Sequence, residues 1–176
     1  MINQQEKILI VDDELLIRKL LRQKLSFEGY QCDEAGSAEH ALERLHLNPC
    51  NLVILDIKMP GKWGTELLPE IKATYPVIAV IMATAIAETS IAIQCMRQGA
   101  DDYICKPFNL EQVSTSVLRT LEKQRLQLKI KEYSNLWKIR LMNKQMRSGS
   151  YFLEVLRPWC MHWKPKISTR VAIHAG

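Results

Sequence analysis

Five polar side chains stand at the ends of short apolar runs in this sequence, and together they have the makings of a phosphoryl-transfer site. They are Asp12, Asp13, Asp56, Thr84 and Lys106. A carboxylate can act as a nucleophile toward phosphorus, as in enzymes that form an aspartyl phosphate. An ammonium, a hydroxyl and a metal ion can offset the charge of the phosphoryl oxygens. We therefore interpret Asp56, which ends the apolar run at 52–55, as an acceptor of phosphate.

Three of these five side chains are carboxylates, which repel one another if the chain brings them together. At about 4 Å, a pair of like charges costs about 4 kcal/mol at an effective dielectric constant of about 20. A cation must therefore balance them. Oxygen ligands without His or Cys favour a hard divalent ion, so the sequence predicts a bound Mg²⁺.

The elements that must position these residues follow from the hydrophobic pattern. Five short apolar runs alternate with segments whose apolar residues recur at helical spacing. The runs are KILIVDDE, YQCDEA, NLVILDI, VIAVIMAT and DDYICKPF. Such alternation predicts an α/β fold with a parallel sheet covered by helices on both faces. Ligands bind beyond the carboxyl ends of the strands in such sheets, where the five polar residues fall.

Four stretches of the sequence resemble the receiver domain of two-component response regulators. They are ILIVDDE, LVILDIKMPGKWGTELL, VIMATA and GADDYICKPF. The resemblance covers about residues 5–122. It implies a CheY-like, flavodoxin-like fold, which is a doubly wound five-stranded parallel sheet with strand order 2-1-3-4-5.

The resemblance also implies a role for each acid. Asp12 and Asp13 would bind Mg²⁺ together with Asp56 and the backbone carbonyl of Lys58. Asp56 would accept a phosphoryl group from a sensor histidine kinase or a phosphotransfer protein. The chain would then change conformation and pass the signal on in a phosphorelay.

Further roles concern the phosphoryl group and the switch. By resemblance, Thr84 and Lys106 would bind the phosphoryl oxygens, and the Lys106–Pro107 peptide bond would be cis. Tyr103 would turn inward together with Thr84 on phosphorylation.

We expect two neighbours of the site to tune the lifetime of the phosphorylated form. Lys58 and Ile86 would flank the phosphoryl group. We expect the bulky Ile86 to limit the access of water, which would make the phosphorylated form long-lived. The alternative is that Ile86 serves packing.

The net charge of +5 conceals two differently composed parts. Residues 1–121 contain 12 Lys and Arg against 16 Asp and Glu, whereas residues 122–176 contain 12 against 3. No apolar run is long enough for a membrane span, and the first residues do not resemble a signal peptide. The five scattered cysteines form no CxxC motif, which fits a reducing cytoplasm. We therefore expect a cytoplasmic protein.

Residues 123–147 are predicted to form a helical linker after the receiver. A weak seven-residue pattern places Leu121, Leu128 and Met142 in one row and Leu118, Ile139 and Met146 in a second. Such a helix can pair two chains into a homodimer. A single solvated helix fits the pattern equally well.

Residues 148–176 are predicted to form an irregular, poorly ordered basic tail. Three of the four tryptophans, Trp137, Trp159 and Trp163, lie in the last 40 residues. Read in the neighbouring frame, the codons for WCMHWKPKI must encode V-[HY]-A-L-E-[AT], and those for STRVAIHAG can encode KYTRGHSRR. This string resembles the start of an HD-GYP domain, a family that hydrolyses cyclic di-GMP at a bimetal site.

We therefore interpret the end of the chain as a frame-shifted, truncated remnant of an HD-GYP domain. One base would be lost near the codons for Leu136 and Trp137, and the catalytic motif would be missing. A natural basic tail is the alternative.

Three classes of function follow from these observations. The first is a phospho-accepting signalling module, which the motif set favours over an enzyme that acts on a separate substrate. The second is the receiver of a cyclic di-GMP phosphodiesterase whose catalytic domain is lost, since His162 and His174 form no HD pair. The third is a DNA-binding regulator. The basic tail shows no helix-turn-helix pattern, so binding to nucleic acid is not expected.

Overall fold

The structure is a computed structural model that describes residues 6–85 and 89–147, without the side chains of residues 89 and 144–147. The predictions for Ile86 and for the tail at 148–176 lie outside the described residues. The described part contains five strands and five helices in strict alternation. They are β1 (Lys7–Val11), α1 (Leu15–Phe27), β2 (Gln31–Ala35), α2 (Ala38–Leu47), β3 (Leu52–Asp56), α3 (Gly64–Thr74), β4 (Ala79–Ala85), α4 (Thr89–Arg97), β5 (Asp102–Lys106) and α5 (Leu110–Arg147).

The strands form one parallel sheet in the order β2-β1-β3-β4-β5. In register, Ile10 pairs with Glu34 on one side and with Ile54 on the other. Leu55 pairs with Met82 in the next strand pair of the sheet. The predicted doubly wound, flavodoxin-like fold is confirmed, and so is its strand order.

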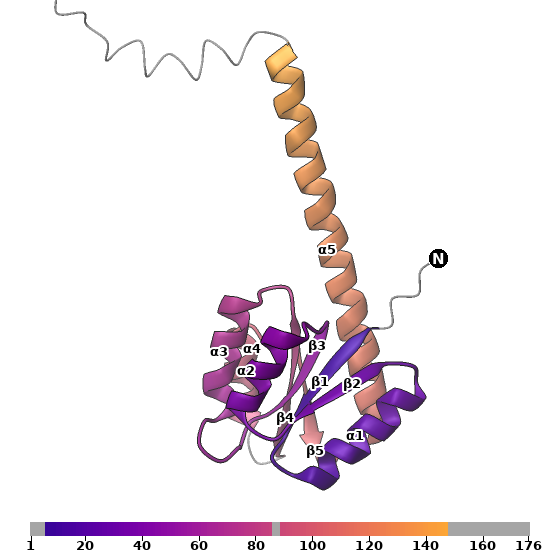
Figure 1. Cartoon of the computed structure of the whole chain (residues 1–176), viewed down its shortest axis with the longest axis vertical. Coiled ribbons are helices and arrows are strands. Elements are labelled where there is room, and N and C mark those ends of the chain that lie inside the picture. Colours follow the sequence, from indigo (N-terminus) through magenta and orange to yellow (C-terminus); the bar gives the residue numbers. More distant parts are fainter. Residues whose placement is uncertain (1–5, 86–88, 148–176) are drawn as a thin grey trace, which may run out of the picture. The chain divides into compact units, whose positions relative to one another are not determined.

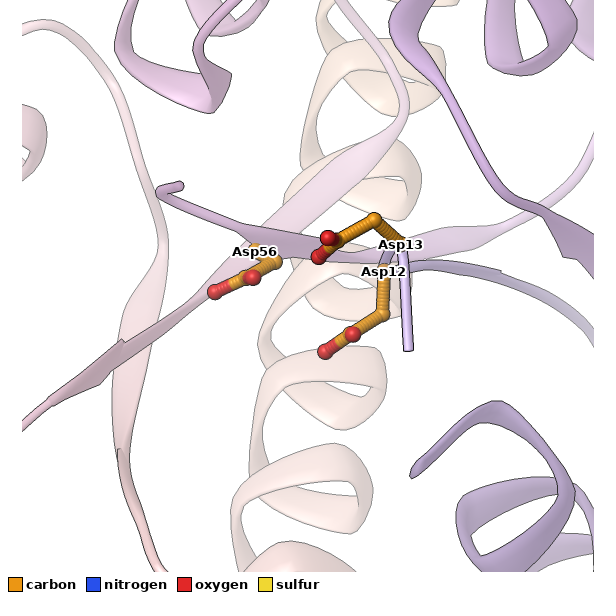
Figure 2. A group of neighbouring side chains, drawn as sticks. All are labelled: Asp12, Asp13 and Asp56. Atoms are coloured by element: carbon orange, nitrogen blue, oxygen red, sulfur yellow. The ribbon is translucent and has the colours of Figure 1, made fainter. Parts of the chain in front are cut away.

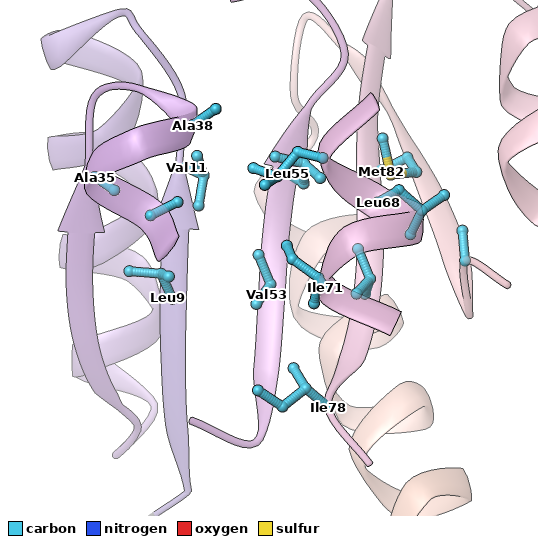
Figure 3. Packing of buried hydrophobic residues seen from close by; sticks show 14 of the residues in the cluster. Leu9, Val11, Ala35, Ala38, Val53, Leu55, Leu68, Ile71, Ile78 and Met82 are labelled. Carbon is cyan, nitrogen blue, oxygen red and sulfur yellow. The ribbon is translucent and has the colours of Figure 1, made fainter. Parts of the chain in front are cut away.

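Each face of the sheet has its own apolar core, because successive residues of a strand point to opposite faces. Leu9 and Val53 face α2, α3 and α4 and pack against residues such as Leu68 and Ile71 of α3 (Figure 3). The opposite face, built on residues such as Ile10, is covered by α1 and α5 (Figure 1). A sheet buried on both faces holds the backbone at the strand ends rigidly, which is what a precise site requires.

Local sequence signals explain where two helices begin and end. Ser37 caps α2, since its Oγ accepts a hydrogen bond from the backbone N–H of His40 at 3.2 Å. Gly29 follows α1 with φ +96°, a conformation that glycine adopts without steric cost. Both signals depend on residues that are neighbours in the sequence.

Helix α5 continues through the boundary predicted between residues 122 and 123. Its apolar residues Val113, Val117 and Leu121 belong to the core, whereas residues 125–143 are exposed. The seven-residue pattern therefore includes a core residue, Leu121, beside an exposed one, Leu118. The chain divides into two compact units between Lys129 and Ile130, and the limits 5–122 and 123–147 stay predictions.

No helix among the described residues has an apolar stretch long enough to cross a membrane.

Candidate functional site

The chemistry-bearing residues of the sequence come together at the carboxyl edge of the sheet. Asp12 directly follows β1, and Asp56 is the last residue of β3. Thr84 lies near the end of β4, and Lys106 is the last residue of β5. Parallel strands end at the same edge, so residues far apart in the sequence meet there.

Three carboxylates form the centre of the site. One oxygen from each of Asp12, Asp13 and Asp56 lies within 4.8 Å of the others, and Figure 2 shows the three side chains extending into the same space. Asp12 and Asp56 are buried, whereas Asp13 is exposed. The cluster is therefore anchored in the protein and reachable from solvent.

Lys106 supplies positive charge to the two buried acids. Its Nζ lies 2.7 Å from Asp12 Oδ2 and 3.0 Å from Asp56 Oδ2. The ammonium also lies 5.9 Å from the centre of the Phe108 ring, within the range of a cation–π contact. One cation thus faces two anions in a partly buried pocket, and the pocket keeps an excess of negative charge.

The pKa of Asp56 is raised, chiefly by burial. Burial raises the pKa of its carboxyl to about 6, and the charge of Asp12 adds to the rise. The hydrogen bond and charge of Lys106 oppose it. Burial acts to lower the pKa of the Lys106 ammonium, but its bonds to Asp12 and Asp56 raise that pKa above its usual value. A further cation near Asp56 would therefore be favourable.

The residues present fit a magnesium ion. Asp12 Oδ2 is buried, and no donor among the described residues is aligned for a hydrogen bond to it, although Lys106 Nζ lies close. Asp12 Oδ1 is held by the backbone N–H of Glu14 at 2.9 Å. Three clustered carboxylates supply the oxygen ligands that Mg²⁺ prefers. Lys58, whose carbonyl is a further predicted ligand, lies two residues beyond Asp56 with an exposed side chain.

Gly64 contributes to the site through the side chain that it lacks. Its N–H donates to Ile57 O at 2.9 Å, where α3 begins against the end of β3. A Cβ on Gly64 would lie 2.0 Å from the backbone oxygen of Asp56, so any other residue would collide with the chain at the acid. No local signal in the sequence marks this glycine, because the clash exists only after folding.

The structure also places Thr84, Tyr103 and the Lys106–Pro107 peptide bond, all of which have predicted roles. Thr84 is buried, and its Oγ1 donates a hydrogen bond to Ala85 O at 3.2 Å. Tyr103 is 43% exposed on β5. The Lys106–Pro107 peptide bond is cis, as expected. The roles of Thr84 and Tyr103 as a switch stay predictions.

A family model described as the response regulator receiver domain matches residues 8–118. Among curated proteins, the chain is 42% identical over 123 residues to the "Probable transcriptional regulator ycf27" of Porphyridium aerugineum. That alignment covers 68% of this chain and 51% of the regulator, so the chain spans about half the length of this relative.

Solved structures show the same fold. NtrX from Brucella abortus superposes with a TM-score of 0.71 at 34% identity, over 74% of this chain and 30% of NtrX. A CheY-like response regulator receiver domain protein from Methanospirillum hungatei gives a TM-score of 0.67 at 34% identity. This second match covers 70% of this chain and 99% of that protein.

Proposed function

Because this chain belongs to the response regulator receiver family of two-component systems, we propose that it accepts a phosphoryl group on Asp56 and relays a signal by changing conformation. Magnesium and an aspartyl phosphate are general features of that family. The observation that carries the proposal is the convergence of Asp12, Asp13 and Asp56 within 4.8 Å, with Lys106 on the two buried acids.

The chemistry is the transfer of a phosphoryl group between two side chains. A carboxylate oxygen of Asp56 attacks the phosphorus of a phosphohistidine on the kinase or phosphotransfer protein. An O–P bond forms, the P–N bond breaks, and the imidazole of the partner leaves with the electron pair. Lys106 and Thr84 would bind the phosphoryl oxygens, since Lys106 Nζ already lies 3.0 Å from Asp56.

A bound Mg²⁺ would supply positive charge to the phosphoryl oxygens. Asp12, Asp13, Asp56 and the backbone carbonyl of Lys58 would hold it. Asp12 is held at both carboxylate oxygens, by the backbone N–H of Glu14 at Oδ1 and by the ammonium of Lys106 at Oδ2.

The test is to incubate the full chain with acetyl phosphate and Mg²⁺ and to measure its intact mass. We expect a gain of one phosphoryl group, which EDTA prevents and Asp56→Asn abolishes. A gain that persists in Asp56→Asn, or that needs no divalent ion, would refute the proposal.

The response to phosphorylation is proposed to run through Thr84 and Tyr103. Thr84 would move toward the phosphoryl group, and Tyr103, now 43% exposed, would turn inward. The lifetime of the acyl phosphate would depend on Lys58 and Ile86. If Ile86 limits the access of water, Ile86→Ala shortens the half-life, and an unchanged or longer half-life would remove the idea.

The output of the signal is open to two further proposals. The linker helix could pair two chains, because residues 125–143 of α5 are exposed and include many apolar side chains. The ycf27 relative is named a probable transcriptional regulator, which makes DNA binding a second candidate function. A salt-dependent band shift with the full chain would support DNA binding.

We propose that the protein works in the cytoplasm, together with its proposed kinase.

The neighbouring-frame reading of the last 40 residues also stays a proposal. It holds that an HD-GYP domain follows in another frame of the gene. Sequencing the gene decides it, because a stop codon shortly after the described string in that frame would end the idea.

A further inference from the structure

We propose that Arg18 is a positioning residue for the magnesium site. Its guanidinium holds the backbone of Asp12 and Asp13 so that the two carboxylates converge. The proposal rests on the proposed function, because it concerns the same Mg²⁺. Arg18 lies on α1, a full turn beyond the acids in sequence and outside the cluster itself.

The guanidinium contacts the backbone of the acids and not their side chains. Arg18 Nη1 donates to the carbonyl oxygen of Asp12 at 2.6 Å and to that of Asp13 at 3.0 Å. Two successive peptide groups are thus fixed by one nitrogen, at the junction between β1 and α1. Because Asp12 and Asp13 extend from this junction into the site (Figure 2), its conformation sets where both carboxylates point.

The surroundings of Arg18 hold the guanidinium in place. Its Nε lies 3.5 Å from Glu34 Oε2 on β2, and both side chains are mostly buried, at 14% and 19% exposure. A Cβ on Gly36 would lie 3.3 Å from Arg18 Nη1, closer than most real contacts, so this glycine leaves the room that the guanidinium needs. Such outer contacts commonly decide how well a metal site is organised.

Arg22 provides a matched control within the same helix. Its Nη1 pairs with the other oxygen of Glu34 at 3.0 Å, but its side chain is 57% exposed. Arg22 carries the same charge and shares the same partner. It has no hydrogen bond to Asp12 or Asp13 among those described.

If Arg18 acts through its charge, its loss changes the affinity for Mg²⁺ in one direction, and if it acts by positioning the acids, in the other. The proposal can therefore be tested. Loss of a positive charge near the site would, through Coulomb's law, strengthen the binding of Mg²⁺. Loss of the two hydrogen bonds would free the junction and weaken binding, because the ion would then have to order the acids itself.

The experiment is a calorimetric titration of the unphosphorylated full chain with MgCl₂, with thermal unfolding in EDTA measured on the same variants. We expect Arg18→Met to weaken the affinity about tenfold. Arg18→Lys keeps the charge but not the fork of donors. We expect it to weaken the affinity for Mg²⁺ less than Arg18→Met does. Arg22→Met should leave the affinity unchanged or slightly higher.

Unchanged or tighter binding in Arg18→Met would overturn the proposal. If that variant does not fold, Gly36→Ala takes its place, since a Cβ 3.3 Å from Arg18 Nη1 would push the guanidinium by a few tenths of an ångström without removing it. Weaker Mg²⁺ binding in Gly36→Ala supports the proposal, and unaltered binding refutes it. Failure of the wild-type chain to bind Mg²⁺ would instead refute the proposed function, which separates the two.

Discussion

Lys106 Nζ lies 3.0 Å from Asp56 Oδ2, so the residue that ends β5 is paired with the residue that ends β3. Strand β4 lies between them in the sheet, and the ion pair therefore spans the carboxyl edge of three strands. The same ammonium contacts Asp12 beyond β3, at 2.7 Å. Before any metal binds, the stability of this edge depends on one lysine that serves two acids.

Lys106→Met is expected to destabilise the metal-free protein. Two buried carboxylates would lose their nearby cation, and the cost is about 2 kcal/mol in the free energy of unfolding at pH 8. Urea denaturation in EDTA measures it, with Lys19→Met, an exposed lysine of α1, as the control. The loss should shrink when Mg²⁺ is added, because the ion replaces the missing charge. An Mg²⁺-independent loss would argue against the shared role of Lys106.

Asp56→Asn is expected to stabilise the protein in EDTA at pH 8. The folded state raises the pKa of Asp56 from 3.8 to about 6, which means that folding disfavours its ionised form. Well below pH 3.8 the carboxyl is protonated in both states, and the penalty is absent. The penalty grows as the pH rises through 3.8 and approaches its full value about one pH unit above the folded pKa of about 6, where linkage gives up to about 3 kcal/mol.

The measurement is the difference in unfolding free energy between Asp56→Asn and the wild type across pH 4 to 8. The gain should increase with pH and be smaller than the linkage value, since Lys106 loses a partner in the variant. Addition of Mg²⁺ should reverse the order of the two proteins. A gain that does not depend on pH would show that the burial of Asp56 charge is not its source.

The arrangement of the acids could be predicted from the sequence because the chemistry lies at the ends of short apolar runs. Asp56 ends a fully buried strand, and Asp12 follows a strand that is buried except at its first residue, Lys7. Both are local signals, and parallel strands bring the two acids to one edge. The fold class therefore predicts that these acids meet at one edge of the sheet. The cap at Ser37 is predictable for the same reason, because it depends on neighbouring residues.

Features that depend on contacts between distant segments could not be predicted. In the sequence, Arg18 looks like any arginine on the surface of a helix. Only the folded junction places its guanidinium on two backbone carbonyls. Leu121 fitted a seven-residue pattern because the core-facing side of α5 has nearly the same period as a coiled-coil seam. Burial against the sheet gives Leu121 its role, and periodicity cannot distinguish the two.

Gly64→Ala is expected to disturb the acceptor strand directly. Its Cβ would lie 2.0 Å from Asp56 O and 3.0 Å from the carbonyl carbon, so the start of α3 must move away from β3. We expect a loss of about 1–3 kcal/mol in stability and slower phosphorylation by acetyl phosphate. Denaturant titration and the time course of intact mass measure the two effects.

Gly61→Ala is the control for Gly64→Ala. Gly61 has φ +82°, but nothing lies within 4 Å of a Cβ there. Its substitution should cost about 1 kcal/mol through backbone strain and leave the phosphorylation rate nearly unchanged. Equal phosphorylation rates in the two variants would contradict a role of Gly64 in the placement of Asp56.

Gln124→Leu is expected to lower stability without affecting the phosphorylation site. Gln124 is nearly buried on α5, and its Nε2 donates to Asn51 O at 2.8 Å and to Val77 O at 2.6 Å, in the loops before β3 and β4. These loops lie at the amino ends of the strands, opposite the acids. Leaving the two carbonyls without this donor should cost about 1–3 kcal/mol in stability. Gln127→Leu, at an exposed position on the same helix, should cost little.

Denaturant titration gives the stabilities of both variants, and acetyl phosphate labelling gives their phosphorylation rates. A rate that falls in Gln124→Leu under conditions where the chain stays folded would mean that the anchor of α5 is coupled to the site across the whole sheet.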